Sequence, residues 1–213
     1  MTDDRTTSAK LRDACIQLVA EAGTKAATAR AVAELAGVSL GLIRHHFGSM
    51  GELLHACDQH VAGLVRTKKE DAIAQGAGFD ALASLRASGS EHVMGYLATR
   101  LGDDAEGIND LVDAMIDDAE GYLAAGVAAG LIAPTDDERG RAVALTMFGL
   151  GTLTLHKHLE RHLDVDLRAA DPATQPGFAR YLRVHMEVFG GLLQPAVREQ
   201  YLAAIAQLSE EDA

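Results

Sequence analysis

Histidine and arginine side chains gather in three short stretches of this chain. The first stretch, GVSLGLIRHHFGSM, places Arg44, His45 and His46 between glycines. Histidine can bind a metal or transfer a proton, and arginine can pair with phosphate. Neighbouring helical residues point about 100° apart, so His45 and His46 do not easily reach one metal ion. We therefore favour contact with a nucleic acid over a metal or catalytic site.

The second stretch, LHKHLERHL, places His158 and His162 four residues apart on one helix face. Such a pair can bind zinc, but the glutamate that follows the first histidine in metalloprotease helices is absent. Cationic histidines near a helix C-terminus also complement the helix dipole. We expect a solvated or interface helix end here. A helical metal-binding protein or an enzyme that uses His158 and His162 is the alternative.

The third stretch, His185-Met186-Glu187, matches the first part of the zinc deaminase signature, but no paired cysteines follow it. The sequence also lacks the glycine-rich phosphate loops and the G-x-S-x-G nucleophile motif. We therefore expect no catalytic residues, no bound metal and no cofactor, and a protein that is not an enzyme.

Charge is distributed unevenly along the chain. The whole chain has a net charge of −12, which argues against a protein that coats nucleic acid with its entire surface. Residues 1–50 carry six Lys or Arg and five Asp or Glu, whereas the remaining 163 residues carry 13 and 26. Only the first quarter is suited to approach a polyanion. The acidic remainder is consistent with a cationic effector or with a solvated surface.

The expected compartment follows from the cysteines and from the hydropathy. Cys15 and Cys57 fall in periodic helical segments and resemble buried apolar residues more than a disulfide framework, which favours a reducing compartment. The start of the chain has no apolar core of signal-peptide type. Uncharged interior stretches such as 121–135 and 142–155 are shorter than the about 20 residues that span a bilayer. We expect a soluble, cytoplasmic protein with no membrane partner.

Apolar residues recur with a period of 3.6 and no sustained period of two is present, so we predict an all-α fold. Thr28 and Ser39 are the expected N-caps of two short helices, and Ser49-Met50-Gly51-Glu52 is a capping box that opens a long helix. A second capping box at Thr135-Asp136-Asp137-Glu138 is expected to begin the helix over 136–163. The other later helices are expected near 79–87, 91–101, 105–131, 176–193 and 195–208.

Two short segments near 28–36 and 40–47, joined by Gly37-Val38-Ser39, have the spacing of a helix-turn-helix. In that motif the first helix packs across the second, and the second helix enters the major groove of DNA. The small residues Ala33 and Gly37 allow the two helices to approach closely.

The run from Leu11 to Leu54 resembles the DNA-binding domain of the TetR (tetracycline-repressor) family of transcriptional regulators. The chain differs from the family pattern at Arg44, where a tyrosine is usual, and at Met50, where a lysine is usual. A guanidinium can keep a phosphate contact, whereas Met50 supplies no charge. The matching positions are Ala14, Gly23, Thr28, Val32, Ala33, Ala36, Gly37, Val38, Ser39, Gly41, Ile43, His46, Phe47, Ser49 and Leu53.

The resemblance implies a three-helix DNA-binding domain over residues 1–50 and a helical effector-binding and dimerisation domain over residues 51–213. It implies a homodimer that binds a palindromic double-stranded operator and represses transcription until a small-molecule effector releases it. We expect Thr28, Arg44 and His46 to contact the DNA backbone, and Leu40, Leu42 and His45 to face base edges. The complete expected DNA-binding set is Thr28, Ser39, Leu40, Gly41, Leu42, Arg44, His45 and His46.

The last long helices are expected to form the dimer interface, because the segment 142–155 is apolar or small nearly all round and needs a partner for one face. A buried core within one subunit is the alternative. The expected interface residues are Met147, Leu150, Thr154, Phe178, Tyr181, Leu182, His185 and Phe189. The middle helices are expected to enclose an effector pocket, with plain core as the alternative for each residue. Its expected lining is Met94, Tyr96, Leu97, Met115, Tyr122, Met147 and Phe148.

Overall fold

A computed structural model describes residues 4–75, 92–103, 107–169 and 171–211 of the chain. Helices and turns make up this part of the chain, which contains no β-strand, so the all-α prediction is confirmed. None of the described helices is long and apolar enough to span a membrane. The expected helix over 79–87 lies outside the described residues.

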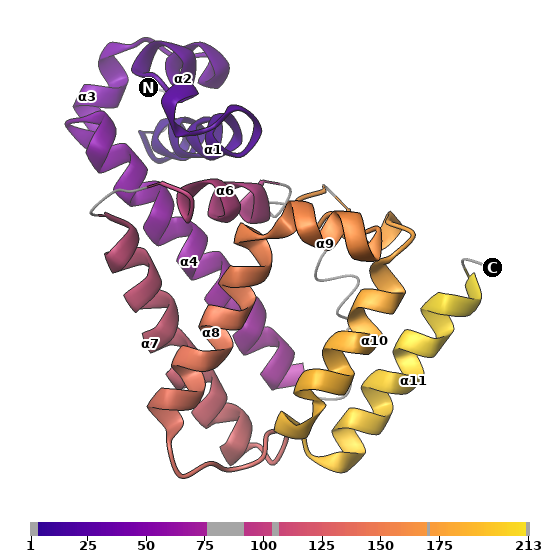
Figure 1. Ribbon diagram of the computed structural model, residues 1–213. Coiled ribbons are helices and arrows are strands. Elements are labelled where there is room, and N and C mark those ends of the chain that lie inside the picture. The colour runs from indigo at the N-terminus through magenta and orange to yellow at the C-terminus, as the bar shows by residue number, and fades with distance from the viewer. Residues whose placement is uncertain (1–3, 76–91, 104–106, 170, 212–213) are drawn as a thin grey trace.

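The helices fall into a head and a larger body (Figure 1). The head consists of α1, α2 and α3, and α4 extends from it into the body, where it packs against α7. Within the body, α6 packs against α1 of the head, and α10 packs against α11. The α-helices are α1 (Asp4–Ala22), α2 (Ala29–Ala36), α3 (Gly41–Phe47), α4 (Met50–Gln75), α6 (Val93–Arg100), α7 (Gly107–Ala128), α8 (Glu138–Thr154), α9 (His156–Leu163), α10 (Phe178–Phe189) and α11 (Pro195–Glu211). Short 3-10 helices cover η1 (Thr24–Ala26), η3 (Pro172–Thr174) and η4 (Gly190–Leu192).

Side-chain caps fix two of the helix starts in the head. The Thr28 hydroxyl oxygen accepts the backbone N–H of Ala31 at 3.2 Å and so begins α2. The Ser49 hydroxyl oxygen accepts the backbone N–H of Glu52 at 3.1 Å and begins α4. Both predicted N-caps are confirmed, and each satisfies a backbone donor that the first helical turn leaves free.

Two other predicted caps were wrong. Leu40, not Ser39, is the N-cap of α3, and its apolar side chain makes no capping bond. The Ser39 backbone carbonyl accepts the N–H of Leu42 at 3.1 Å, and the Leu40 carbonyl accepts that of Ile43 at 3.3 Å. Helix α8 is capped by Asp137, whose carboxylate accepts the Gly140 N–H at 2.7 Å. An aspartate two residues after Thr135 therefore takes the capping role.

The single helix expected over 136–163 is divided at Leu155 into α8 and α9. The hydroxyls of Thr152 and Thr154 donate to the carbonyls of Phe148 and Leu150, four residues earlier, at 2.8 and 3.0 Å. Such bonds compete with the helical ladder and bend helices. The apolar periodicity continues across this break, so it could not reveal the division.

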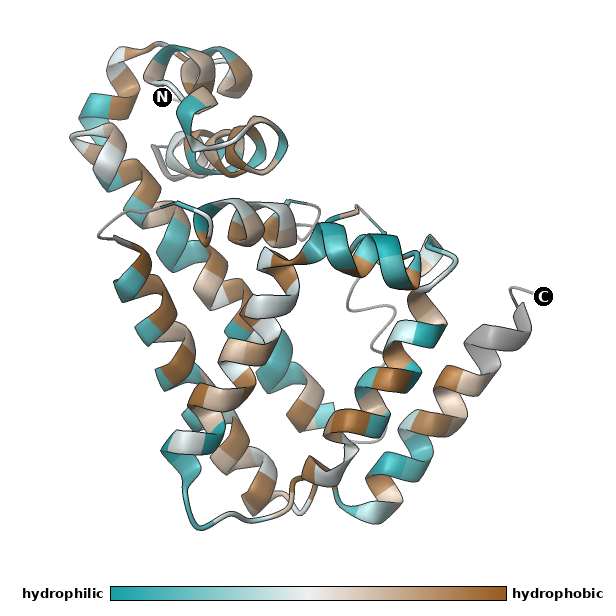
Figure 2. Cartoon of the chain, viewed as in Figure 1, coloured by the Kyte–Doolittle hydropathy of each residue, from teal (hydrophilic) through white to brown (hydrophobic). Residues whose placement is uncertain are grey.

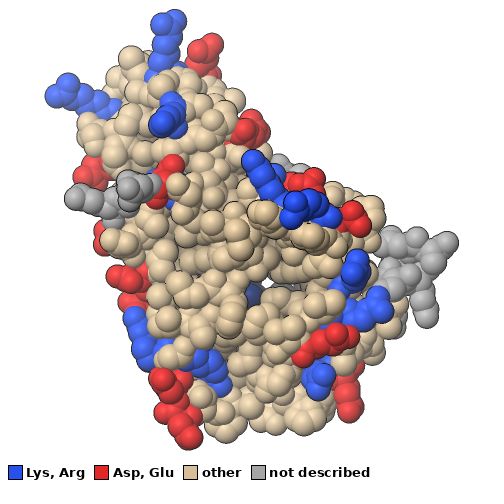
Figure 3. Space-filling view, in the orientation of Figure 1, with Lys and Arg blue, Asp and Glu red and all other residues tan. Residues whose placement is uncertain are grey.

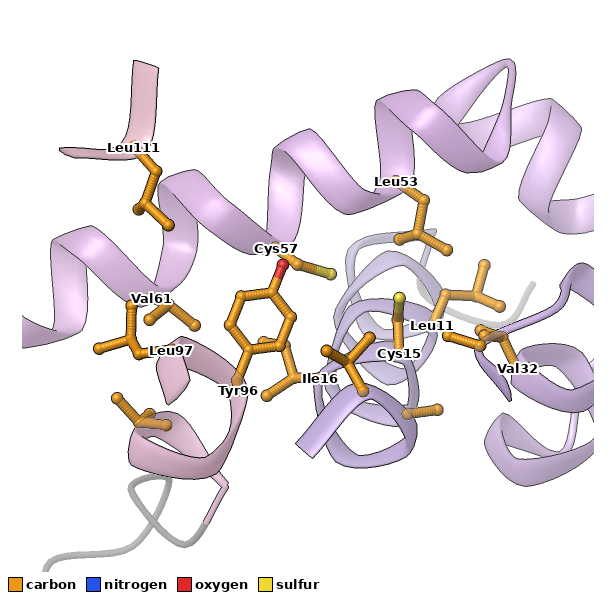
Figure 4. Close-up of a cluster of buried hydrophobic side chains, with 14 of the residues drawn as sticks. Leu11, Cys15, Ile16, Val32, Leu53, Cys57, Val61, Tyr96, Leu97 and Leu111 are labelled. Carbon is orange, nitrogen blue, oxygen red and sulfur yellow. The ribbon is translucent and has the colours of Figure 1, made fainter. Parts of the chain in front are cut away.

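One hydrophobic core joins the head to the body (Figure 4). The side chains of Leu53, Cys57 and Val61 project from α4 into this core, where α1 and α6 meet it. Cys15 and Cys57 are both free and fully buried, as the sequence predicted. The proposed domain boundary after residue 50 falls in the first turn of α4, so α4 is shared between the head and the body.

Candidate nucleic-acid interface

Helices α2 and α3 form the helix-turn-helix. Gly37 ends α2 with a backbone φ of +66°, a left-handed conformation that favours glycine, and its N–H bonds back to the carbonyl of Glu34 at 3.1 Å. The next residue, Val38, packs against the core and so anchors the turn. This turn redirects the chain between two helices that pack against each other.

The exposed face of α3 is the candidate recognition surface. Ile43 is 3% exposed and fastens the helix to the core, while Leu40 is 55% exposed. Arg44 and His45 are also exposed, one turn after Leu40 and Gly41. The positions 40, 41, 44 and 45 therefore share one outward face of the helix.

The remaining expected DNA-binding residues lie at the edges of this face. Thr28 and Ser39 are exposed, whereas His46 is half-buried beside Phe47. Leu42 is also half-buried and packs against the core, so the structure separates it from the outward face that holds Leu40 and His45. Met50 packs against the same core, which gives this departure from the family pattern an apolar role.

The charges of the head suit the approach of a polyanion. Exposed basic side chains at Lys10, Lys25, Arg30 and Arg44 are distributed over α1 to α3. Figure 3 shows basic side chains projecting from the head beside fewer acidic ones, and both kinds along the body. A guanidinium on the outward face of α3 can bind a phosphate with two hydrogen bonds.

Buried charged groups link the head to the body, and sequence reasoning missed them. Arg100 of α6 donates to both carboxylate oxygens of Asp58 of α4, at 3.0 and 2.9 Å. The Tyr96 hydroxyl donates to Asp58 at 2.7 Å. The sequence did contain a sign of this cluster: Asp58 occupies an apolar position of α4, four residues after Leu54 and three before Val61.

The same arginine reaches the head through a second carboxylate. Arg100 donates to Asp103 at 3.0 Å, and the hydroxyl of Thr24 in η1 donates to the same oxygen of Asp103 at 2.5 Å. Helix α6 also approaches α1 closely, since a Cβ atom at Gly95 would lie 3.2 Å from the Cβ of Ala20. These contacts therefore link the position of α6 to the orientation of the head.

The electrostatics of this cluster favour its charged form. The hydrogen bonds from Arg100 to Asp58 raise the pKa of the guanidinium further above its usual range. Burial, followed by the nearby charge of Asp58, raises the pKa of Tyr96, which stays a neutral hydrogen-bond donor. Replacing either Arg100 or Asp58 with an uncharged residue would leave the other charge buried without its partner.

Within the described part of the chain, the seven expected effector-pocket residues fall into three groups. Tyr96 and Leu97 are fully buried in the core, and Met94 and Met115 pack against it. Tyr122 belongs to a second cluster around Ala119 and Leu123. Met147 and Phe148 are exposed on α8. Phe148 alone of the seven lines the groove between α8 and α10.

The expected dimer residues divide between the surface and the interior. Leu150 and Phe178 are buried within the subunit, whereas Met147, Thr154 and His185 are exposed and Tyr181, Leu182 and Phe189 are half-buried. Further exposed apolar side chains on the same two helices are Val143, Phe148, Val184 and Val188. Figure 2 shows apolar bands on α8 and α10, in contrast to the hydrophilic α9.

His158 and His162 lie on the exposed helix α9 with Arg161 between them. The Arg161 guanidinium lies 3.2 Å from His158 Nδ1 and 3.1 Å from His162 Nε2. Across the described residues, no three His, Cys, Asp or Glu side chains are arranged to hold a metal ion. The geometry of α9 is thus that of a solvated helix end.

Comparisons with known proteins agree with this architecture. Residues 11–57 match the family described as bacterial regulatory proteins, tetR family, and residues 90–193 match the tetracyclin repressor-like C-terminal domain. The chain is 38% identical over 168 residues to the HTH-type transcriptional regulatory protein RaaS of Mycobacterium tuberculosis, covering 78% of each chain.

Solved structures share the fold at low sequence identity. CprB of Streptomyces coelicolor, a TetR family protein solved in complex with its operator sequence, has a TM-score of 0.55 at 17% identity over 98% of each chain. NalD of Pseudomonas aeruginosa, the secondary repressor of the MexAB-OprM multidrug efflux pump, has a TM-score of 0.52 at 19% identity, covering 90% of this chain and 99% of its own. The helix-turn-helix head, the all-helical body and the two family matches agree: this chain belongs to the TetR family of transcriptional regulators.

Proposed function

We propose that the protein is a homodimeric repressor that binds a palindromic operator through α3 and is released by a small-molecule effector. The observation that carries the proposal is the outward face of α3, where Leu40, Arg44 and His45 are exposed on a helix that Ile43 fastens to the core. A fixed helix with exposed side chains can enter the major groove without losing its own packing.

The contacts divide into two kinds. Arg44 pairs with backbone phosphates, together with Thr28 and His46, and fixes the register of the head on DNA. Leu40 and His45 face base edges, where an apolar side chain packs against the methyl group of thymine. Thr28 caps α2 through its oxygen lone pair and keeps its hydroxyl hydrogen for a phosphate.

A dimer is suited to a palindromic operator, because it can place two recognition helices about 34 Å apart, the length of one turn of DNA. The exposed apolar side chains Met147 and Phe148 on α8, and Val184 and Val188 on α10, support a helical interface between two copies. Figure 3 shows a largely uncharged surface over α8, with basic and acidic side chains along α10. Charged residues are depleted in the cores of such interfaces.

Effector release requires a connection between the body and the head. The cluster of Asp58, Arg100, Asp103 and Thr24 supplies one, since it ties α4 and α6 to η1. A ligand that binds one arrangement of α4 and α6 more tightly changes the distance between the two heads.

The proposal is tested by fluorescence anisotropy of the labelled promoter fragment beside the protein's own gene. Arg44→Ala should weaken binding and lower the slope of log K against log salt by about one, as loss of a phosphate contact does. Arg161→Ala, which removes an exposed arginine of α9 outside the expected dimer interface, is the matched control and should change neither quantity. An unchanged affinity and salt slope for Arg44→Ala would contradict the assigned role.

A further inference from the structure

The only two cysteines of the chain meet in the core that joins the head to the body. Cys15 projects from α1 and Cys57 from α4, and Figure 4 shows their sulfur atoms pointing toward one another. Hydrogen bonding between the two side chains is the main cause that lowers the pKa of Cys15 and raises that of Cys57. An approach of the two sulfurs to about 2 Å would complete a disulfide.

The cysteines lie where the head is attached to α4. Cys57 Sγ also lies 3.6 Å from the carbonyl oxygen of Arg12, a second acceptor on α1 for its thiol. The next residue of α4, Asp58, belongs to the buried pair with Arg100. Helix α2 packs against α1, whereas the recognition helix α3 packs against α4. The way α1 crosses α4 therefore sets how the two halves of the helix-turn-helix lie relative to each other.

Burial controls the access of an oxidant to this pair. Both cysteines are 0% exposed, so an oxidant reaches them when α1 separates from α4. Local openings of this kind cost less free energy than global unfolding. Hydrogen peroxide is small and uncharged, which suits it to such an opening. Disulfides in reducing compartments are commonly transient and redox-sensing, in keeping with a pair that stays reduced at rest.

We propose that peroxide joins Cys15 and Cys57 in a reversible disulfide, and that this bond weakens operator binding by changing how α1 crosses α4. The Cys15 thiolate attacks one peroxide oxygen and releases hydroxide, which leaves a sulfenic acid. The Cys57 thiol then displaces the sulfenic hydroxyl as water and closes the S–S bond. In total, two thiols lose two protons and two electrons, and one peroxide becomes two molecules of water.

The packing of the core explains why the bond would affect DNA binding. The S–S bond is shorter than any contact between two unbonded sulfur atoms, so α1 and α4 must shift to form it. Protein interiors are close-packed and transmit such a shift to their neighbours. The inference adds a redox input to the proposed function and rests on its operator binding, but not on the effector or the dimer.

Hydrogen peroxide and the full-length protein test the proposal. After treatment, peptide mass mapping should find Cys15 joined to Cys57, and iodoacetamide added in urea should label neither residue. The Kd for the promoter fragment, measured by fluorescence anisotropy, should rise about fivefold or more, the lower end of typical couplings between sites. Dithiothreitol should restore the original Kd, because it reduces the disulfide.

The control must separate the cysteines from the methionines, which peroxide also oxidises. Cys57→Ala keeps Cys15 but removes its partner, so peroxide should leave its Kd unchanged within about twofold after dithiothreitol and before it. Dithiothreitol does not repair methionine sulfoxide, which needs its own reductases. If circular dichroism shows that Cys57→Ala is unfolded, reversal by dithiothreitol in the unsubstituted protein decides between the two.

Three results would overturn the proposal. One is that iodoacetamide still labels both cysteines after peroxide treatment of the folded protein. Another is that the disulfide forms and the operator Kd stays the same. The third is that folded Cys57→Ala shows the same reversible rise in Kd.

Hydrogen exchange separates this inference from the proposed function, because it needs no DNA. The disulfide should slow amide exchange in α1, since it closes the opening between α1 and α4. A reduced protein that binds no operator, but whose α1 exchanges more slowly after oxidation, would lose the proposed function and keep the redox-linked change in the head. Operator binding that peroxide leaves unchanged would do the reverse.

Discussion

Arg100 of α6 and Asp58 of α4 form a buried ion pair with two hydrogen bonds, at 3.0 and 2.9 Å, and both residues are less than 5% exposed. The pair lies beside the hydrophobic core that joins the head to the body. Two charges removed from water are costly unless each is paired, so the geometry of α4 and α6 is fixed by this contact.

Replacing Arg100 with methionine should lower the free energy of unfolding by about 3 to 5 kcal/mol, because it leaves the Asp58 carboxylate buried without a partner. Arg139→Met removes an exposed, solvent-screened pair instead and should change the free energy of unfolding far less. Urea unfolding followed by circular dichroism measures both variants. Equal, small changes would show that the buried pair does not fix the α4 and α6 contact.

The contact between Thr24 and Asp103 should be energetically coupled across the head and the body. Thr24→Val removes the donor and Asp103→Ala removes the acceptor of this hydrogen bond, and a double-mutant cycle should give a coupling energy of about 0.5 to 1.5 kcal/mol. Thr67→Val, at an exposed site on α4, provides the control for loss of a hydroxyl. Strictly additive effects of the two substitutions would mean that η1 is not held to α6 through Asp103.

Leu40 and Leu35 are both exposed, at 55% and 46%, but only Leu40 lies at the start of the recognition helix. Leu40→Ala should reduce the preference for operator over random DNA by about 1 kcal/mol, the size of one base contact. Leu35→Ala should leave that preference unchanged. Competition binding at one fixed salt concentration gives both values, and equal selectivity of the two variants would remove Leu40 from base recognition.

The exposed apolar strip on α8 and α10 predicts a dimer that one charge can separate. Val184→Glu should convert the protein to monomers, because it places a carboxylate in an apolar interface. Ala124→Glu, at an exposed site on α7, should not. Sedimentation velocity distinguishes the two states, and a dimeric Val184→Glu protein would place the interface elsewhere.

Most of the fold could be predicted from helical periodicity and from capping residues. Thr28 and Ser49 were predicted as caps because their hydroxyls precede apolar runs at the right spacing, and both act as caps in the structure. The division at Leu155 was missed, because hydroxyl bonds from Thr152 and Thr154 to the helix backbone leave no mark on the apolar pattern. The capping role of Asp137 was missed because two acidic residues follow Thr135 and either can cap.

The candidate sites were predictable only in part. The exposed face of α3 follows from the period of the helix around Ile43, although Leu42 proved to pack inward. The Arg100 cluster joins residues 42 positions apart, and no local pattern reports such a distant pairing. The contact between Cys15 and Cys57 depends on how α1 meets α4, which is a property of tertiary packing rather than of either helix alone.

The central claim is that two copies of α3 read a palindromic DNA sequence, and selection of bound sequences from a random double-stranded pool tests it most directly. The purified protein should enrich an inverted repeat whose half-site centres lie about 10 base pairs, or a multiple of one turn, apart. Arg44→Ala should recover the same repeat more weakly, because phosphate contacts carry no sequence information. A pool that shows no enriched sequence, or a single unrepeated site, would contradict the claim.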